Sequence, residues 1–132
     1  TREDARRLIT GDYAPLLQSR EAFAAECYAL MQSRCYRPKA IVEYDRKAFI
    51  AKENKIRVTF DSRIVATESS FDLFDERLNM APVLDPGAVV MEVKYNGFLL
   101  DYIRRMINTV DQSELSVSKY MLARQNGYRY RL

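Results

Sequence analysis

The chain has 132 residues, enough for one domain with its own core, and 21 Lys and Arg against 18 Asp and Glu give a net charge of +3. With 48% hydrophobic and 30% charged residues it is not a disordered chain, and no apolar run reaches the roughly 20 residues of a membrane span. Two Cys and no His exclude a disulfide scaffold, the usual zinc sites and catalysis by histidine.

Two helices are predicted before the first strand, over residues 3–9 and 20–33. The second helix has an apolar stripe at helical spacing, formed by Phe23, Cys27, Leu30 and Met31. Pro38 ends the helical tendency. We expect Cys27 and Cys35 to be reduced thiols and the protein to be cytoplasmic.

The hydrophobic period changes to two after residue 40, which predicts a hairpin of strands 40–50 and 55–66. The second strand should have an apolar face and a charged face. The apolar residues are Ile56, Val58, Phe60 and Ile64, and the polar residues that alternate with them include Arg57, Thr59, Asp61 and Arg63.

The rest of the chain predicts a weak strand at 71–74, a clear strand at 88–95, and helices at 98–110 and 116–126. The element order predicts a single α+β domain, residues 1–132, with an antiparallel sheet. Helices 20–33 and 98–110 are expected to cover the apolar face of that sheet.

The charged faces of the strands allow two interpretations. They form the solvated side of a sheet, or they turn inward and bind phosphates through Arg and Lys and a divalent cation through Glu. Glu92 and Lys94 share one face of the third strand, as a Glu-x-Lys pair. Ser118 and Lys119 begin the last helix, where Ser118 serves as an N-cap or the helix terminus binds a phosphate.

Nucleic acid is not expected as a partner. The net charge of +3 is small, and no strand carries an aromatic pair on its charged face. The aromatic and basic tail, residues 128–131, could stack on a single strand or pack its tyrosines on the sheet.

Four segments, in this order and spacing, resemble the VTC domain, the polyphosphate polymerase domain of the triphosphate tunnel metalloenzyme (CYTH-like) superfamily. The segments are residues 37–49, with Tyr-x-Arg-x-Ala-Phe at its end, 56–61, 90–95 and 117–120. The resemblance covers about residues 36–124. It implies an antiparallel β tunnel whose interior is lined by Arg, Lys and Glu.

The resemblance also implies roles for individual residues. The implied phosphate-binding residues are Arg46, Arg57, Lys94, Ser118 and Lys119. Arg57, Lys94 and Lys119 are the expected catalytic residues. Glu92 is the expected ligand of a divalent metal, Mn²⁺ or Mg²⁺, and Arg46, Arg57, Lys94 and Lys119 are expected to converge around it.

The implied reaction transfers the γ-phosphoryl group of ATP to a growing polyphosphate chain. A triphosphate or nucleotide hydrolase of the same superfamily and a non-catalytic module that binds polyphosphate or another polyanion are the alternatives. A small nucleic-acid-binding α+β domain is disfavoured by the low charge.

The family's domain begins with further strands that carry an additional Glu-x-Lys, and the helices at 3–9 and 20–33 are similar to those in its middle. We therefore expect this chain to correspond to the C-terminal half of the domain, forming half of a tunnel-type barrel. The N-terminal half or a second chain, which could be another copy of this chain, would complete the tunnel. The C-terminal half alone is expected to be inactive.

Overall fold

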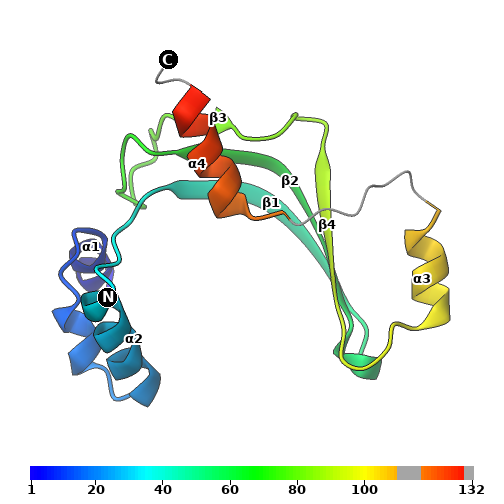
Figure 1. The fold of residues 1–132 in the computed structure, drawn as a ribbon, viewed down its shortest axis with the longest axis horizontal. Helices are drawn as coiled ribbons and strands as arrows, with labels where there is room; N and C mark the ends of the chain where they lie inside the picture. Colours follow the sequence, from blue (N-terminus) through cyan, green and yellow to red (C-terminus); the bar gives the residue numbers. More distant parts are fainter. Residues whose placement is uncertain (110–116, 130–132) are drawn as a thin grey trace. The chain divides into compact units, whose positions relative to one another are not determined.

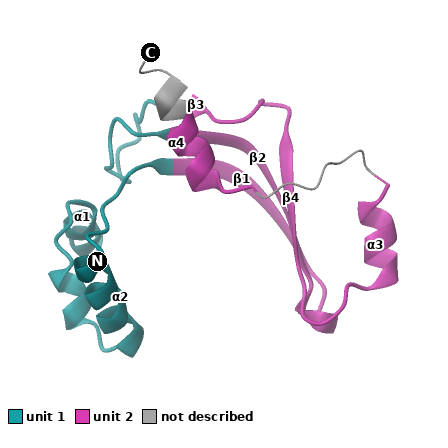
Figure 2. Cartoon of the chain, in the orientation of Figure 1, with its two compact units in different colours: residues 1–41, 67–79 teal, residues 42–66, 80–132 magenta. Residues whose placement is uncertain are grey.

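The computed structural model describes residues 1–109 and 117–129. Within these ranges, helices precede and follow the strands of one four-stranded antiparallel sheet, so the predicted α+β class is confirmed (Figure 1). The chain divides into two compact units: residues 1–41 with 67–79, and residues 42–66 with 80–132 (Figure 2). No helix in the described ranges is long and apolar enough to cross a membrane.

The first unit is helical. It contains α1 (Arg2–Ile9), the 3-10 helix η1 (Ala14–Gln18) and α2 (Ala22–Ser33). A capping box starts α1, in which the Thr1 hydroxyl accepts a hydrogen bond from the Asp4 amide at 3.1 Å. The helix α2 packs against η1 within this unit.

The sheet belongs mainly to the second unit, and β2 is its central strand. The strands are β1 (Ile41–Ile50), β2 (Arg57–Thr67), β3 (Ala81–Pro82) and β4 (Val89–Lys94). β1 pairs with one edge of β2, and β4 and β3 pair with successive parts of the other edge (Figure 1). The weak strand predicted at 71–74 is absent, and the short β3 is the fourth strand instead. Within the described residues the sheet is not closed into a barrel.

The alternation of buried and more exposed side chains along β2 shifts at Arg63. The buried positions of β2 are Thr59 and Asp61 before this residue and Ile64, Ala66 and the terminal Thr67 after it. Arg63 has a φ of +50°, which is unusual for a residue inside a strand. We infer a β-bulge at Arg63, which shifts the alternation by one residue. The prediction that Ile64 continues the apolar face of Ile56, Val58 and Phe60 is therefore wrong.

The apolar face of the sheet is only half-buried at Val58 and Phe60. The Phe60 ring meets the ring of Phe49 edge to face, with centroids 5.9 Å apart. The helix predicted at 98–110 is the shorter α3 (Asp101–Ile107). Two of its large side chains, Tyr102 and Met106, are exposed.

The last helix, α4 (Lys119–Arg129), lies across the sheet (Figure 1). Its first residue, Lys119, contacts Asp61 of β2. Ala123 of α4 is buried, with 2% of its surface exposed. α4 thus covers the charged face of β2, where a solvated surface would have remained open.

Candidate anion-binding site

The centre of the site is the carboxylate of Asp61, in the middle of β2, with none of its surface exposed. Arg46 on β1 donates two hydrogen bonds to it, from Nε to Oδ1 at 2.6 Å and from a terminal nitrogen to Oδ2 at 2.7 Å. The Nζ of Lys119, at the start of α4, lies 2.7 Å from Oδ2. One buried carboxylate therefore joins two cations that are far apart in the sequence.

The register of the hairpin explains why Arg46 reaches Asp61. The amide of Ala51 donates to the carbonyl of Ile56 at the turn, and regular pairing from that point places Arg46 directly across from Asp61. Residues directly opposite one another in an antiparallel pair have their side chains on the same face. The side chains of Arg46 and Asp61 therefore meet in the bidentate geometry that suits a guanidinium and a carboxylate.

The charges of this cluster are strongly coupled. The pKa of Asp61 is lowered to about 2, mainly by the hydrogen bonds from Arg46 and to a smaller extent by the bond from Lys119, while burial works in the opposite direction. The hydrogen bond to Asp61 likewise raises the pKa of Arg46, to which the nearby charge of Glu92 adds a smaller effect. At neutral pH the cluster therefore consists of one anion and two cations, with a net charge of +1.

Tyr44 on β1 positions both cations. The guanidinium of Arg46 and the ammonium of Lys119 each lie 5.0 Å from the centre of its ring. In the contacts of the described residues, Arg46 uses two of its five N–H donors and Lys119 one of its three. The remaining donors are those that a phosphate group would use.

Two further cross-strand pairs of side chains lie on the same face of the sheet as Asp61. We call this face the polar face; its residues are Tyr44 and Arg46 on β1, Arg57, Thr59 and Asp61 on β2, and Glu92 and Lys94 on β4. Thr59 is opposite Glu92, and Arg57 is opposite Lys94. Glu92 and Lys94 form an ion pair of 3.1 Å that is partly exposed to solvent. The polar face thus has a buried centre and an exposed cationic margin.

The structure brings together two of the four cations that were expected to converge. Arg46 and Lys119 meet at Asp61, whereas Glu92 was the expected centre. Arg57 and Lys94 are on the same face, four residues along the strands from Asp61. Sequence reasoning placed Asp61 on this face and left it out of the site.

The other expected residues have simpler surroundings. The Ser118 hydroxyl accepts a hydrogen bond from the Met121 amide at 3.4 Å, which fits the N-cap interpretation of this residue. Arg63, expected on the charged face, pairs with Asp45 beside the bulge. The aromatic tail at 128–131 lies outside the residues whose side chains the structure describes.

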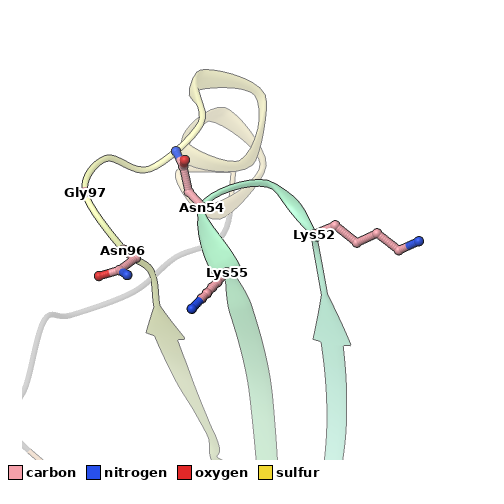
Figure 3. A pocket seen from close by; sticks show the side chains of 5 residues that line it. All are labelled: Lys52, Asn54, Lys55, Asn96 and Gly97. Atoms are coloured by element: carbon pink, nitrogen blue, oxygen red, sulfur yellow. The ribbon is translucent and has the colours of Figure 1, made fainter.

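A separate hollow of about 460 Å³ lies at the turn end of the sheet, lined by Lys52, Asn54, Lys55, Asn96 and Gly97 (Figure 3). Two hydrogen bonds join its loops, from the Asn96 amide to the Asn54 carbonyl at 2.8 Å and from the Asn54 side chain to the Phe98 carbonyl at 2.9 Å. The side chain of Lys52 points away from it. This hollow is open and does not include the Asp61 cluster.

A divalent metal would find few protein ligands here. In the described part of the chain no group of three or more Asp, Glu, His or Cys side chains could hold an ion. Asp61 is occupied by two cations, which leaves Glu92, now paired with Lys94. One carboxylate is compatible with Mg²⁺ or Mn²⁺ only where phosphate oxygens and water supply the other ligands.

Comparison with known proteins gave one match. A family model described as the VTC domain matches residues 1–127, nearly the whole chain. No curated protein and no solved structure matched.

Proposed function

The chain belongs to the VTC domain family, and from this premise we propose that its polar face binds an oligophosphate and serves metal-dependent transfer of the γ-phosphoryl group of ATP to a polyphosphate chain. The family membership supports the class of ligand. The polar face supports the location, because it gathers cations from three strands and a helix.

The observation that carries the proposal is the pair of cations at Asp61. Arg46 and Lys119 come from different elements, are fixed by one buried carboxylate, and within the described residues keep N–H donors that have no partner. Donors that are already held in place bind an anion without first losing side-chain freedom. We therefore assign them the first contacts with a phosphate group.

The exposed margin of the polar face would bind the next phosphate groups. Arg57 and Lys94 lie directly opposite one another on β2 and β4, and Lys119 sits at the start of α4, next to Ser118. Phosphoryl transfer depends mainly on positioning the groups and neutralising their charge, which Arg and Lys can do without histidine. In this proposal Arg57, Lys94 and Lys119 stabilise the charge on the transferred group.

Glu92 is the proposed ligand of the divalent cation. Its carboxylate lies on the polar face and pairs with Lys94 at 3.1 Å, so Glu92 would hold the cation beside the lysine that is assigned to phosphate. A bound Mn²⁺ or Mg²⁺ would supply Lewis acidity and neutralise phosphate charge. The remaining ligands would be phosphate oxygens and water.

A non-catalytic polyphosphate-binding module is the second candidate function. Two observations favour it: the described part of the chain has no cluster of three or more Asp, Glu, His or Cys side chains that could hold a metal ion, and its sheet is not closed. In the described structure β1 pairs with β2 alone, so its outer edge is open to strands of another segment, a second chain or a second copy. Such strands would complete a tunnel if the protein is a transferase.

Incubation with ATP and Mn²⁺, followed by electrophoresis with phosphate staining, tests the proposal. A ladder of products is the expected result for a polyphosphate polymerase. Free phosphate alone would identify a hydrolase, and binding of tripolyphosphate without any product would identify a binding module. The absence of product and of tripolyphosphate binding would contradict the proposal as a whole. Arg20→Ala, an exposed arginine outside the polar face, serves as the control variant.

A further inference from the structure

Thr59 has a buried hydroxyl without a hydrogen-bond partner. Only 3% of the surface of this residue is exposed. In the described residues, its Oγ1 is the one buried side-chain oxygen or nitrogen for which no partner is present. The other buried threonine, Thr67, shares a hydrogen bond of 2.8 Å with Ser69. Buried hydroxyls are normally bonded because a missing bond costs free energy, so Thr59 calls for an explanation.

The place of Thr59 in the sheet suggests that explanation. It lies at the middle of the polar face, opposite Glu92 on β4, and its neighbours on the same face of β2 are Arg57 and Asp61. On one side of Thr59, Asp61 binds Arg46 and Lys119, and on the other side Arg57 lies opposite Lys94. We call these two groups the cationic rows. The hydroxyl is therefore flanked along the strand by cations on both sides.

We propose that the Thr59 hydroxyl donates a hydrogen bond to a phosphate oxygen of the oligophosphate bound between these two cationic rows. This assignment rests on the proposed function of the polar face. The surroundings favour an anion as the partner of the hydroxyl, because two cations lie on each side of it along the sheet. The nearby carboxylates are already paired: Asp61 with two cations, and Glu92, opposite Thr59, with Lys94. A hydroxyl can donate one hydrogen bond to such an anion. On binding, phosphate oxygens would replace the side chains that now cover Oγ1 of Thr59 and exclude water from it.

The proposal predicts opposite effects on stability and on binding. Thr59→Val keeps the shape of the side chain and removes the hydroxyl. The unliganded variant should be more stable, with a melting temperature raised by about 3–5 °C, because a buried polar group without a partner has been removed. Its affinity for tripolyphosphate should fall by about 10- to 100-fold, the usual worth of a hydrogen bond to a charged group. Thr59→Ser, which keeps the hydroxyl, should retain wild-type affinity.

Thermal unfolding and isothermal titration with tripolyphosphate, with and without Mn²⁺, decide the matter. Equal affinities of wild type and Thr59→Val would overturn the proposal, as would a lower melting temperature, which would mean that the hydroxyl has a structural partner. A loss of affinity seen only with Mn²⁺ would assign the hydroxyl to the cation and also overturn it. Arg46→Ala distinguishes failure of the Thr59 assignment from failure of the proposed oligophosphate site. If that variant loses binding and Thr59→Val does not, only the role of Thr59 fails, whereas a wild type that does not bind contradicts the function of the polar face.

Discussion

At the scale of single residues, the site depends on a carboxylate at the centre of a basic face. Two cations held close together repel one another, and Asp61 offsets that repulsion while fixing their positions. A buried carboxylate is itself costly unless it is paired, so the three groups depend on one another. The same arrangement leaves a net positive charge beside donors that are not in use.

Asp61→Asn is therefore expected to destabilise the protein. The amide keeps the shape but loses the charge that binds Arg46 and Lys119, so we expect the free energy of unfolding to fall by about 1.5–3 kcal/mol. Urea denaturation at neutral pH measures this change. Asp101→Asn, at an exposed site with only a long ion pair to Arg104, is the matched control and should change stability by less than about 0.5 kcal/mol. Equal effects of the two substitutions would contradict the central role of Asp61.

The low pKa of Asp61 predicts a specific pH dependence. Because the pKa of the folded state lies near 2, below the ordinary value of 3.8, the folded protein binds fewer protons than the unfolded chain between these values. The contribution of Asp61 to stability is therefore complete above about pH 5 and is lost as the pH falls through about 4 towards 2. The difference in stability between wild type and Asp61→Asn should shrink over this window, as urea denaturation at several pH values would show. A constant difference down to pH 2 would argue against a lowered pKa.

At the scale of elements, the bulge inferred in β2 decides which of its side chains are buried. It brings Ile64 and Ala66 into the buried alternation that Thr59 and Asp61 begin. Without the extra residue at Arg63, Ile64 and Ala66 would lie on the face of the sheet opposite to Thr59 and Asp61. The polar centre of the site and the apolar contacts further along the strand thus share one face.

Substitutions at Arg63 test the bulge. The left-handed φ of +50° suits glycine and is strained for a β-branched residue. Arg63→Gly should change the free energy of unfolding by less than about 1 kcal/mol, whereas Arg63→Val should lower it by about 1–2 kcal/mol. Both variants lose the exposed ion pair to Asp45, so their comparison isolates the backbone effect. Thermal or urea unfolding in which Val is the better tolerated residue would rule the bulge out.

The sequence predicted the elements better than their contacts. The period-two patterns of β1, β2 and β4 reflect local alternation, and the structure has strands there. The bulge escaped prediction because Arg63 is not the glycine that usually marks one. Asp61 was missed as a site residue because its importance comes from Lys119, 58 positions later in the chain, and no local pattern reports that contact. The packing of α2 against η1 is likewise a matter of tertiary structure.

At the scale of the whole molecule, the net charge of +3 conceals an uneven distribution. The polar face contains Arg46, Arg57, Lys94 and Lys119 against Asp61 and Glu92, so much of the excess positive charge is found there. Anion binding at this face should therefore weaken as salt is added, since its margin is exposed and screened by ions. The family membership and this local charge point to the same class of ligand.

The most direct test of the account is isothermal titration of tripolyphosphate into wild type, Lys119→Ala and the control Arg20→Ala. Lys119 is chosen because it links α4 to Asp61 and keeps donors for a phosphate group. The account predicts binding by wild type and by Arg20→Ala, and an affinity about 10-fold or more lower for Lys119→Ala. Equal affinities of all three proteins, or no binding by wild type, would contradict the claim that the polar face is an oligophosphate site.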